Sequence, residues 1–194
     1  MADLLANIYL IGYRGSGKTS IAPFLASALG YDWIDTDQSI EAILGEPIAS
    51  FFIRVGEKDF RHIESHTICT VAKTPRQVVS LGGGAVLDPA NQAILRSTGK
   101  IVWLDCPVDV LAMRLSADQT QGSGRPSLTG LGVVEEIESV LRVREPIYRN
   151  LADLIVPTGS SSPEALASKI ATWWLDADAL PSAPKTSAHK SLPE

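Results

Sequence analysis

One octapeptide near the start of the chain has the residue types and the spacing that bind phosphate groups. It begins with Gly12, has further glycines at Gly15 and Gly17, and ends with Lys18 and Thr19. Glycines allow backbone N–H groups to point toward an anion, and the positive end of a following helix adds to the attraction. The lysine ammonium can reach the outer phosphates of a nucleotide, and the threonine hydroxyl can bind Mg²⁺. The octapeptide therefore predicts a nucleotide phosphate site.

The residues on both sides of this loop favour the same interpretation. The segment 7–11 is mostly apolar and partly β-branched, as in a buried parallel strand, and apolar side chains recur with helical spacing in 20–29. A strand, a glycine loop and a helix are the context that distinguishes a phosphate-binding loop from a chance match. We therefore count Ser16 and Ser20 among the nucleotide-binding residues as well. The alternative is a glycine-rich turn with a surface lysine.

The length and composition indicate one folded domain. The chain has 194 residues, of which 45% are hydrophobic, and a net charge of −5, whereas nucleic-acid-binding proteins usually present a basic face. No apolar run is long enough to cross a bilayer, no export signal is evident, and Cys69 and Cys106 show neither metal-ligand spacing nor a disulfide framework. We therefore expect a cytoplasmic protein that binds neither nucleic acid nor a membrane.

Strand-like and helix-like segments alternate along the chain. We predict strands at 7–11, 31–34, 78–81, 101–104 and 154–156. Strands that alternate with helices form a parallel sheet with right-handed crossovers and helices on both faces. The predicted fold is therefore a three-layer α/β/α domain with a five-stranded parallel sheet, covering residues 1–180. The segment 181–194 is rich in Pro, Ser, Ala and Lys, which predicts a disordered tail.

Two segments of the second half interrupt the regular pattern. The segment 118–132 is rich in Gly, Ser, Thr and Gln, and we expect a mobile loop there. The helix predicted at 133–151 contains Pro146, which lacks the backbone N–H of a helical hydrogen bond, so we expect a kink or a break at this point.

Two of the predicted strands end in groups that suit ligand binding. Asp35 and Asp37 follow the second strand, and Gly82, Gly83 and Gly84 follow the third. Ligands of open parallel sheets bind beyond the carboxyl ends of the strands. Carboxylates two residues apart on an extended segment point the same way, so one can hold Mg²⁺ while the other binds a hydroxyl group. Three glycines allow positive φ angles and a close approach of the backbone to a ligand. Taken alone, both patterns are more typical of ordinary turns.

Three arginines and two histidines are further candidates. Arg61 and Arg144 fall in predicted helices, and Arg125 falls in the polar loop. A guanidinium group can bind a carboxylate or a phosphate through two hydrogen bonds. Each arginine taken alone is more typical of a solvated surface. His62 and His66 have the spacing of a metal-binding pair, but no third ligand is evident, and we assign them to a helix surface.

Together these features resemble the shikimate kinase family, over residues 8–175. The resemblance depends on the order and spacing of the phosphate loop, Asp35-Thr36-Asp37, Gly56-Glu57 with Phe60-Arg61, the three glycines, Arg125-Pro126, and Arg144 before Pro146 and Tyr148. It implies a P-loop fold like that of nucleoside monophosphate kinases, with an acceptor-binding subdomain at about 35–72 and a mobile lid at about 118–132. It also implies that a monomer transfers the γ-phosphoryl group of ATP, with Mg²⁺, to the 3-hydroxyl of shikimate in aromatic amino acid biosynthesis.

The resemblance assigns roles on the nucleotide side. Lys18 would bind the β- and γ-phosphates, Thr19 and Asp35 would hold Mg²⁺, and Arg114 and Pro163 would flank the adenine. On the acceptor side it makes Asp37 the group that binds the shikimate hydroxyls and orients the attacking one, whose proton it could take. Arg61 and Arg144 would bind the shikimate carboxylate beside the backbone of Gly82, Gly83 and Gly84, and Arg125 would meet the transferring phosphoryl group.

Two other functions compete with this interpretation. A kinase of the same architecture that acts on gluconate would share the phosphate loop, but the glycine triplet and the pair Arg61 and Arg144 argue against it. A regulator that binds ATP without catalysis is expected to lack Lys18, Asp37 or Arg125, and this chain has all three.

Overall fold

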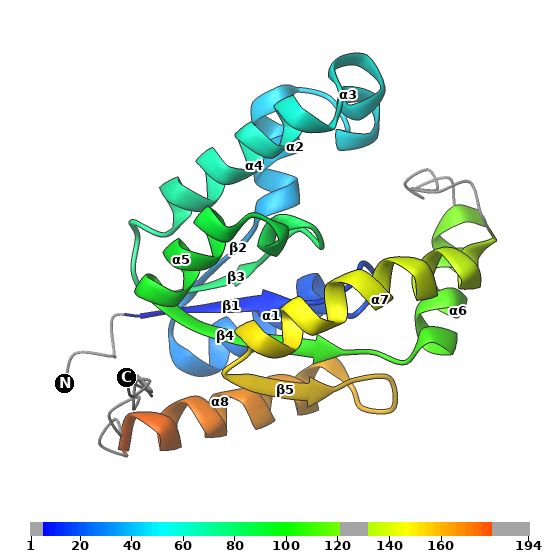
Figure 1. Cartoon of the computed structure of the whole chain (residues 1–194). Helices are drawn as coiled ribbons and strands as arrows, with labels where there is room; N and C mark the ends of the chain where they lie inside the picture. The colour runs from blue at the N-terminus through cyan, green and yellow to red at the C-terminus, as the bar shows by residue number, and fades with distance from the viewer. Residues whose placement is uncertain (1–5, 121–131, 180–194) are drawn as a thin grey trace, which may run out of the picture.

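The computed structural model describes residues 6–120 and 132–179, and within them five strands form one parallel sheet (Figure 1). The strand order is β2-β3-β1-β4-β5. The strands are β1 (Asn7–Ile11), β2 (Asp32–Asp35), β3 (Gln77–Ser80), β4 (Gly99–Asp105) and β5 (Leu154–Pro157). The predicted fold class is confirmed, and each predicted strand is present with ends shifted by at most two residues.

The central strand β1 explains the two hydrophobic layers. Successive side chains of a strand point to opposite faces of the sheet. On one face Ile8 and Leu10 pack among side chains of α1 (Lys18–Leu29) and α8 (Pro163–Ala179). Residues of β1 that point the other way, Tyr9 and Ile11, pack in a separate apolar cluster. All five residues of β1 are buried, as expected for a strand covered on both sides.

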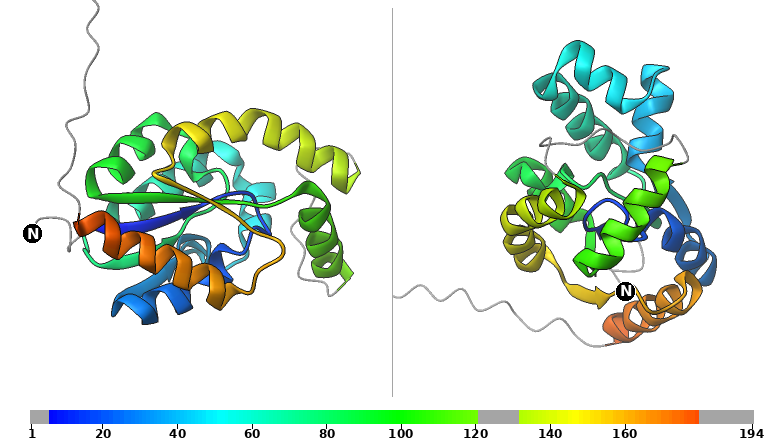
Figure 2. Two further views of the ribbon diagram at one scale, coloured as in Figure 1. Left: turned by 90° about the horizontal axis from the view of Figure 1, so that it is seen from below. Right: turned by 90° about the vertical axis from the view of Figure 1, so that its right-hand side faces the viewer.

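The second face of the sheet is covered by three longer helices (Figure 2). Side chains of α4 (Glu57–Val71), α5 (Pro89–Thr98) and α7 (Val133–Leu151) join this cluster, together with the short 3₁₀ helix η2 (Ala85–Leu87). α6 (Val108–Thr120) packs against α7 at the end of the sheet where β4 finishes.

A helical unit stands away from the sheet at the same end of the molecule (Figure 1). It consists of α2 (Thr36–Leu44), α3 (Ile48–Val55) and the first turns of α4. Gly45 ends α2 in the left-handed conformation with a φ angle of 68°, which glycine adopts without steric cost. The unit has its own apolar cluster of Ile40, Ile48, Phe51 and Phe60. It can therefore hold its shape while it projects over the carboxyl edge of the sheet.

For the second half, the structure excludes one of the two alternatives at Pro146, a break, and corrects the start of the polar loop. α7 continues without a break through Pro146, because Tyr148 and Leu151 beyond the proline are buried in the core and hold the last turns in place. The helix α6 includes residues 118–120, which we assigned to the polar loop. The remainder of the predicted lid, residues 121–131 with Arg125, lies outside the described residues, as does the predicted tail 181–194. Among the described helices, none is long and apolar enough to span a membrane.

Leu10 offers a test of the central layer. Its side chain is fully buried in the centre of β1, so the change Leu10→Ala leaves a cavity that its neighbours cannot fill. We expect the free energy of unfolding to fall by about 2–5 kcal/mol, measured by urea denaturation. Ile43→Ala serves as the control, because Ile43 is 70% exposed, and its effect should stay within about 0.5 kcal/mol. Similar losses for both variants would contradict this packing.

Candidate active site

The phosphate loop connects β1 to α1 and has the backbone conformation that only glycine adopts without strain. Gly12, Gly15 and Gly17 have φ angles of 143°, 79° and 99°. At Gly12 space is restricted as well, because a Cβ atom there would lie 2.7 Å from the carbonyl oxygen of Leu104. Conformation therefore requires all three glycines, and packing is a second reason at Gly12.

Lys18 bridges two carbonyl groups of this loop. Its side chain is buried, and Nζ donates hydrogen bonds to the carbonyl oxygens of Gly12 and Tyr13, each at 2.9 Å. The ammonium group therefore lies inside the curve of the loop, in the cavity where phosphates of a nucleotide would be bound. This cavity has a volume of about 500 Å³.

The carboxylate of Asp35 links three elements beside the loop. Its Oδ2 atom accepts hydrogen bonds from the hydroxyl of Thr19 at 2.7 Å and from that of Ser80 at 2.8 Å. Its Oδ1 atom accepts the backbone N–H groups of Asp37 and Gln38 and so caps α2. The structure therefore confirms the capping role of Asp35, and its other oxygen atom faces the hydroxyl groups of Thr19 and Ser80, beside the phosphate loop.

The expected geometry of the two aspartates is wrong in one respect. Asp35 is the last residue of β2, but Asp37 already belongs to the first turn of α2, so the pair does not lie on an extended segment. The helix begins this early because Asp35 caps it. Helical geometry directs Asp35 and Asp37 differently: Asp35 faces the phosphate-loop cavity, whereas Asp37 lines this cavity and a second one.

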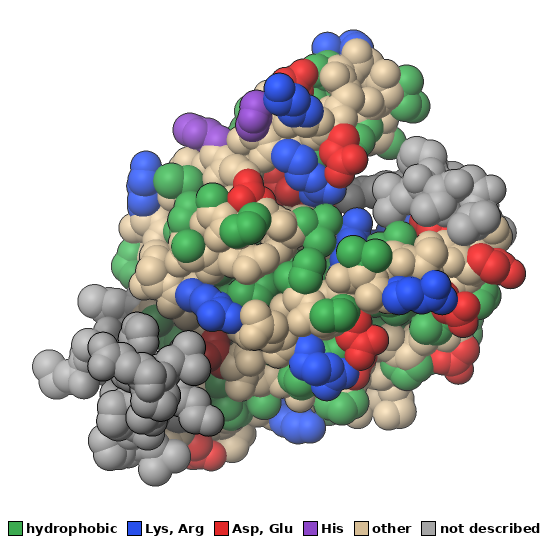
Figure 3. All heavy atoms as spheres, viewed as in Figure 1, with side chains coloured by type: hydrophobic (Ala, Val, Ile, Leu, Met, Phe, Trp, Pro, Cys, Tyr) green, Lys and Arg blue, Asp and Glu red, His purple; other side chains and the backbone are tan. Residues whose placement is uncertain are grey.

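This second cavity adjoins the first and lies between the helical unit and α7. Its volume is about 430 Å³, and Asp37, Arg61 and Arg144 all line it, although they are far apart in the sequence. Phe52, Phe60 and Ile48 add an apolar wall from α3 and α4. The view of the surface shows basic side chains in the recess between the helical unit and α7 (Figure 3).

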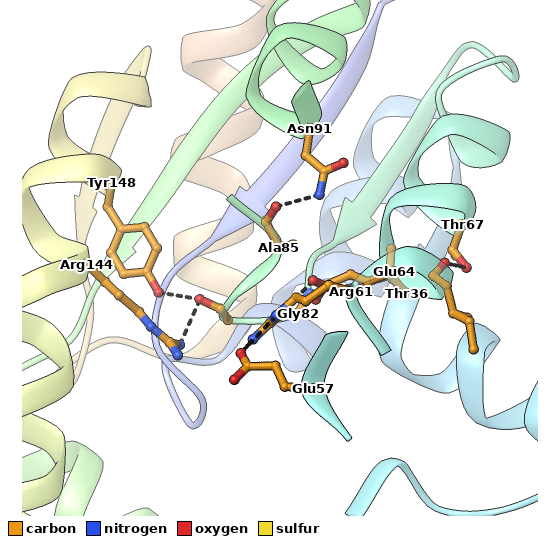
Figure 4. A network of polar contacts seen from close by, with 12 residues as sticks. Thr36, Glu57, Arg61, Glu64, Thr67, Gly82, Ala85, Asn91, Arg144 and Tyr148 are labelled. Carbon is orange, nitrogen blue, oxygen red and sulfur yellow. Dashed lines mark hydrogen bonds and ion pairs between the residues drawn. The ribbon is translucent and has the colours of Figure 1, made fainter. Parts of the chain in front are cut away.

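Two glutamates hold Arg61 in this cavity. Arg61 Nη1 forms an ion pair with Oε2 of Glu64 at 2.6 Å, and Nη2 forms one with Oε1 of Glu57 at 3.0 Å (Figure 4). Burial raises the pKa of Glu64, although the neighbouring Arg61 lowers it. Burial would lower the pKa of Arg61, but Glu64 and then Glu57 outweigh this effect and raise it. The guanidinium group is therefore charged and fixed in place.

On the opposite side of the cavity, α7 supplies Arg144 and Tyr148. Both side chains reach toward the glycine segment after β3 (Figure 4), where Arg144 Nη1 and the Tyr148 hydroxyl donate to the carbonyl oxygen of Gly83 at 3.0 and 2.7 Å. Burial raises the pKa of Tyr148, so its hydroxyl remains a donor at neutral pH. A single carbonyl group thus orients both α7 side chains.

The glycine triplet is explained by close packing and not by positive φ angles. None of Gly82, Gly83 and Gly84 has a positive φ angle, so this part of our expectation is wrong. A Cβ atom at Gly82 would lie 2.7 Å from Oδ1 of Asp37, and one at Gly84 would lie 2.6 Å from Nη1 of Arg61. Side chains here would therefore displace the polar groups that line the cavity.

Arg114 and Pro163, which we expect beside the adenine, both lie at the outer part of the phosphate-loop cavity. Arg114 lies on α6 and donates to the carbonyl oxygen of Gly15 at 2.7 Å, and Pro163 is the first residue of α8. Both line the cavity, together with Thr158 and Ser161 from the segment between β5 and α8.

The structure thus brings most of the predicted site residues together. The phosphate-loop cavity is lined by Gly15, Ser16, Gly17, Lys18, Thr19, Ser20, Asp35, Asp37, Arg114 and Pro163. The second cavity is lined by Asp37, Arg61, Gly82, Gly83, Gly84 and Arg144. Gly12 contacts Lys18 from the back of the loop. Arg125 lies outside the described residues.

Several residues of the site were not assigned from the sequence. Ser80 binds Asp35, and its position directly before the glycine triplet was an available signal. Glu64 received no role, although its place three residues after Arg61 in a predicted helix was an available signal. Glu136 forms an ion pair with Arg14 of the phosphate loop at 2.5 Å, and no local pattern indicates this contact, because 122 positions separate the two residues.

The oxygen atoms near Thr19 suit Mg²⁺. This ion prefers hard oxygen ligands and is usually bound through one or two carboxylates plus the phosphates of its nucleotide. The Thr19 hydroxyl and the Asp35 carboxylate meet at 2.7 Å on the wall of the phosphate-loop cavity. In the part of the chain that the structure describes, no cluster of three or more His, Cys, Asp or Glu residues forms a metal cage. The donor set therefore fits an ion that is bound together with a nucleotide.

Known proteins resemble this chain in sequence and in fold. The shikimate kinase of Rhodopirellula baltica is 40% identical over 164 residues, which cover 84% of this chain and 88% of that protein. Shikimate kinase 2 of Dickeya chrysanthemi is 42% identical over 149 residues, or 77% of this chain and 85% of that protein. The solved structure of shikimate kinase from Acinetobacter baumannii in complex with shikimate has a TM-score of 0.83 at 32% identity, and the match covers 89% of this chain and 94% of that one.

The sheet order and a phosphate loop that faces a cavity lined by guanidinium groups define a P-loop kinase with a fold like that of nucleoside monophosphate kinases. The family model of shikimate kinase matches residues 14–174. This chain therefore belongs to the shikimate kinase family.

The raised pKa of Glu64 predicts how stability depends on pH. The folded protein binds the Glu64 proton more tightly than the unfolded chain does, because burial raises the pKa above its usual value of 4.5. The contribution of Glu64 to the free energy of unfolding must then fall as the pH rises from the unfolded pKa through the folded one. We expect Glu64→Gln to gain stability relative to the wild type as the pH rises above 4.5, measured by urea denaturation.

The control for this experiment is Glu57→Gln. Glu57 pairs with the same arginine, but its side chain is 66% exposed, whereas that of Glu64 is 2% exposed. If the two variants show the same pH dependence relative to the wild type, burial of Glu64 is not the cause.

Proposed function

We propose that this protein transfers the γ-phosphoryl group of ATP to the 3-hydroxyl of shikimate, the reaction of the family to which it belongs. The observation that carries this proposal is the common cavity of Asp37, Arg61 and Arg144, next to the phosphate loop. A cyclic acid with several hydroxyl groups needs a cation for its carboxylate and an acceptor for its hydroxyls, and these residues supply both.

On the nucleotide side the phosphate loop provides the charge and the donors. Lys18, already inside the loop, binds the β- and γ-phosphates when ATP replaces its contacts with the carbonyl oxygens of Gly12 and Tyr13. Thr19 and Asp35 hold Mg²⁺, which neutralises charge on the phosphate oxygens when it is bound. Arg114 and Pro163 flank the adenine at the outer part of the cavity.

On the acceptor side the carboxylate and the hydroxyl groups of shikimate are bound separately. Arg61 and Arg144 approach from opposite walls, and their guanidinium groups bind the carboxylate. Asp37 lines both cavities and binds the hydroxyl groups at the junction, so the attacking oxygen faces the γ-phosphate. The backbone of Gly82, Gly83 and Gly84 completes the floor. Residues 35–72 form the acceptor-binding subdomain in this proposal.

The transfer itself makes and breaks one bond to phosphorus. The 3-oxygen of shikimate forms a bond to the γ-phosphorus, the bond from this phosphorus to the β,γ-bridging oxygen breaks, and its electron pair leaves with ADP. The proton of the hydroxyl passes to the carboxylate of Asp37 and from there to solvent. Catalysis of this kind depends on positioning and on charge stabilisation rather than on a covalent intermediate.

The role of Arg125, the oligomeric state, the localisation and the pathway are inferred from the resemblance to the family. We infer that Arg125 meets the transferring phosphoryl group and that the protein acts as a cytoplasmic monomer. The aromatic amino acid pathway supplies its substrate in this interpretation.

Acceptor selectivity tests the proposed function. We expect ADP release coupled to shikimate, and no release above background with gluconate or a nucleoside monophosphate, because only shikimate combines a carboxylate for two guanidinium groups with a ring that fits between them. A coupled assay of ADP formation with each acceptor in turn measures this selectivity. Equal ADP release without any acceptor would indicate an ATPase, and turnover of gluconate would favour the related sugar-acid kinase.

Asp37 tests the assigned chemistry. The change Asp37→Asn removes the group that orients the hydroxyl and takes its proton while it keeps the size of the side chain. We expect kcat to fall by about 100-fold or more, with nearly unchanged binding of ATP in calorimetry. Asp32→Asn is the matched control, since Asp32 is exposed at the opposite end of β2. Wild-type activity of Asp37→Asn would remove Asp37 from this role.

A further inference from the structure

Arg14 occupies a special position in the phosphate loop. Of the described residues, Arg14, Asp37 and Gly83 line both the phosphate-loop cavity and the acceptor cavity. Asp37 is an acid and Gly83 has no side chain, so Arg14 supplies the positive charge among these three. A phosphoryl group that moves from one cavity to the other must pass this junction.

A carboxylate of α7 fixes the direction of the Arg14 side chain. Nη2 of Arg14 lies 2.5 Å from Oε1 of Glu136, in the first turn of α7. The side chain of Glu136 is 2% exposed and that of Arg14 is 22% exposed. The guanidinium carbon also lies 5.9 Å from the centre of the Tyr13 ring. The guanidinium group is therefore held from one side and retains access to the cavities on the other.

A gain in stability is a poor explanation for this ion pair. The desolvation of a buried carboxylate offsets most of the attraction to its partner, and apolar side chains of similar size are often as stable or more so. Arg14 also keeps an unused donor, because its Nε–H forms no hydrogen bond with any residue that the structure describes. A partly buried cation with an unused donor, placed at the junction of two cavities, is suited to bind an anion there.

We propose that Arg14, positioned by Glu136, is a further catalytic residue that binds the phosphoryl group during transfer and in the phosphorylated product. This inference rests on the proposed function and adds a residue to it. In phosphoryl transfer, negative charge is spread over the three equatorial oxygens, and a guanidinium group beside them stabilises it. Lys18 lies on the nucleotide side, whereas Arg61 and Arg144 lie in the acceptor cavity. Among the residues that the structure describes, Arg14 is the cation that lies between the nucleotide side and the acceptor side.

The test compares two ligands that differ only by the phosphoryl group. The variant Arg14→Met/Glu136→Gln removes the guanidinium group without leaving an unpaired buried carboxylate. We expect its affinity for shikimate 3-phosphate, measured by calorimetry, to fall by about tenfold or more. Its affinities for shikimate and for ADP should stay within about twofold of the wild type, and kcat should fall by about tenfold or more.

The ratio of the two affinities separates binding of the phosphoryl group from a merely structural role. A distorted loop would weaken shikimate, its phosphate and ADP together, and this result would overturn the proposal, as would an unchanged ratio. Glu136→Gln alone keeps the guanidinium group but loosens it, so we expect a smaller change of the same ratio. An unchanged ratio in this variant would remove Glu136 from the positioning role.

The matched control is Arg149→Met/Glu145→Gln. This pair also lies on α7, with 2.8 Å between Nη2 of Arg149 and Oε1 of Glu145, but both side chains are largely exposed. We expect wild-type kcat and ligand affinities. If the wild-type protein itself does not phosphorylate shikimate, the proposed function fails; if the wild type is active and only the affinity ratio is unchanged in the Arg14 variant, this further inference fails alone.

Discussion

The carboxylate of Asp35 is the interaction on which the rest of the site depends. One of its oxygen atoms starts α2 by accepting two backbone N–H groups, and the other accepts the hydroxyls of Thr19 on α1 and Ser80 on β3. These hydrogen bonds join the phosphate loop, the sheet and the helical unit at one point. Because α2 begins here, the carboxylate of Asp37 is set at the junction of the two cavities.

Close packing imposes a second constraint on the acceptor side. Gly82 and Gly84 leave no room for a Cβ atom beside Asp37 and Arg61, and the carbonyl oxygen of Gly83 accepts hydrogen bonds from Arg144 and Tyr148. The segment after β3 thus fixes polar groups that come from α2, α4 and α7. Residues from distant parts of the chain can keep a common geometry because they share this one backbone segment.

The buried charges of the site are arranged in a consistent way. Glu64 and Glu136 are each 2% exposed, and each pairs with an arginine that lines a cavity, Arg61 and Arg14. Burial of such carboxylates costs free energy, and for Glu64 the cost is visible as a raised pKa. In exchange for this cost, the carboxylate orients its arginine, because a guanidinium group held on one side presents its remaining donors in a defined direction.

The sequence by itself determined the features that depend on neighbouring residues. The glycine spacing with Lys18 and Thr19 defined the phosphate loop, the alternation of strands and helices defined the sheet, and the order of motifs indicated the family. Local patterns did not predict that α7 passes Pro146 unbroken, that Asp37 is already helical, or that the glycine triplet has ordinary φ angles. The pair of Arg14 and Glu136 could be found only in the tertiary structure, because packing of α7 beside the loop joins residues that are 122 positions apart.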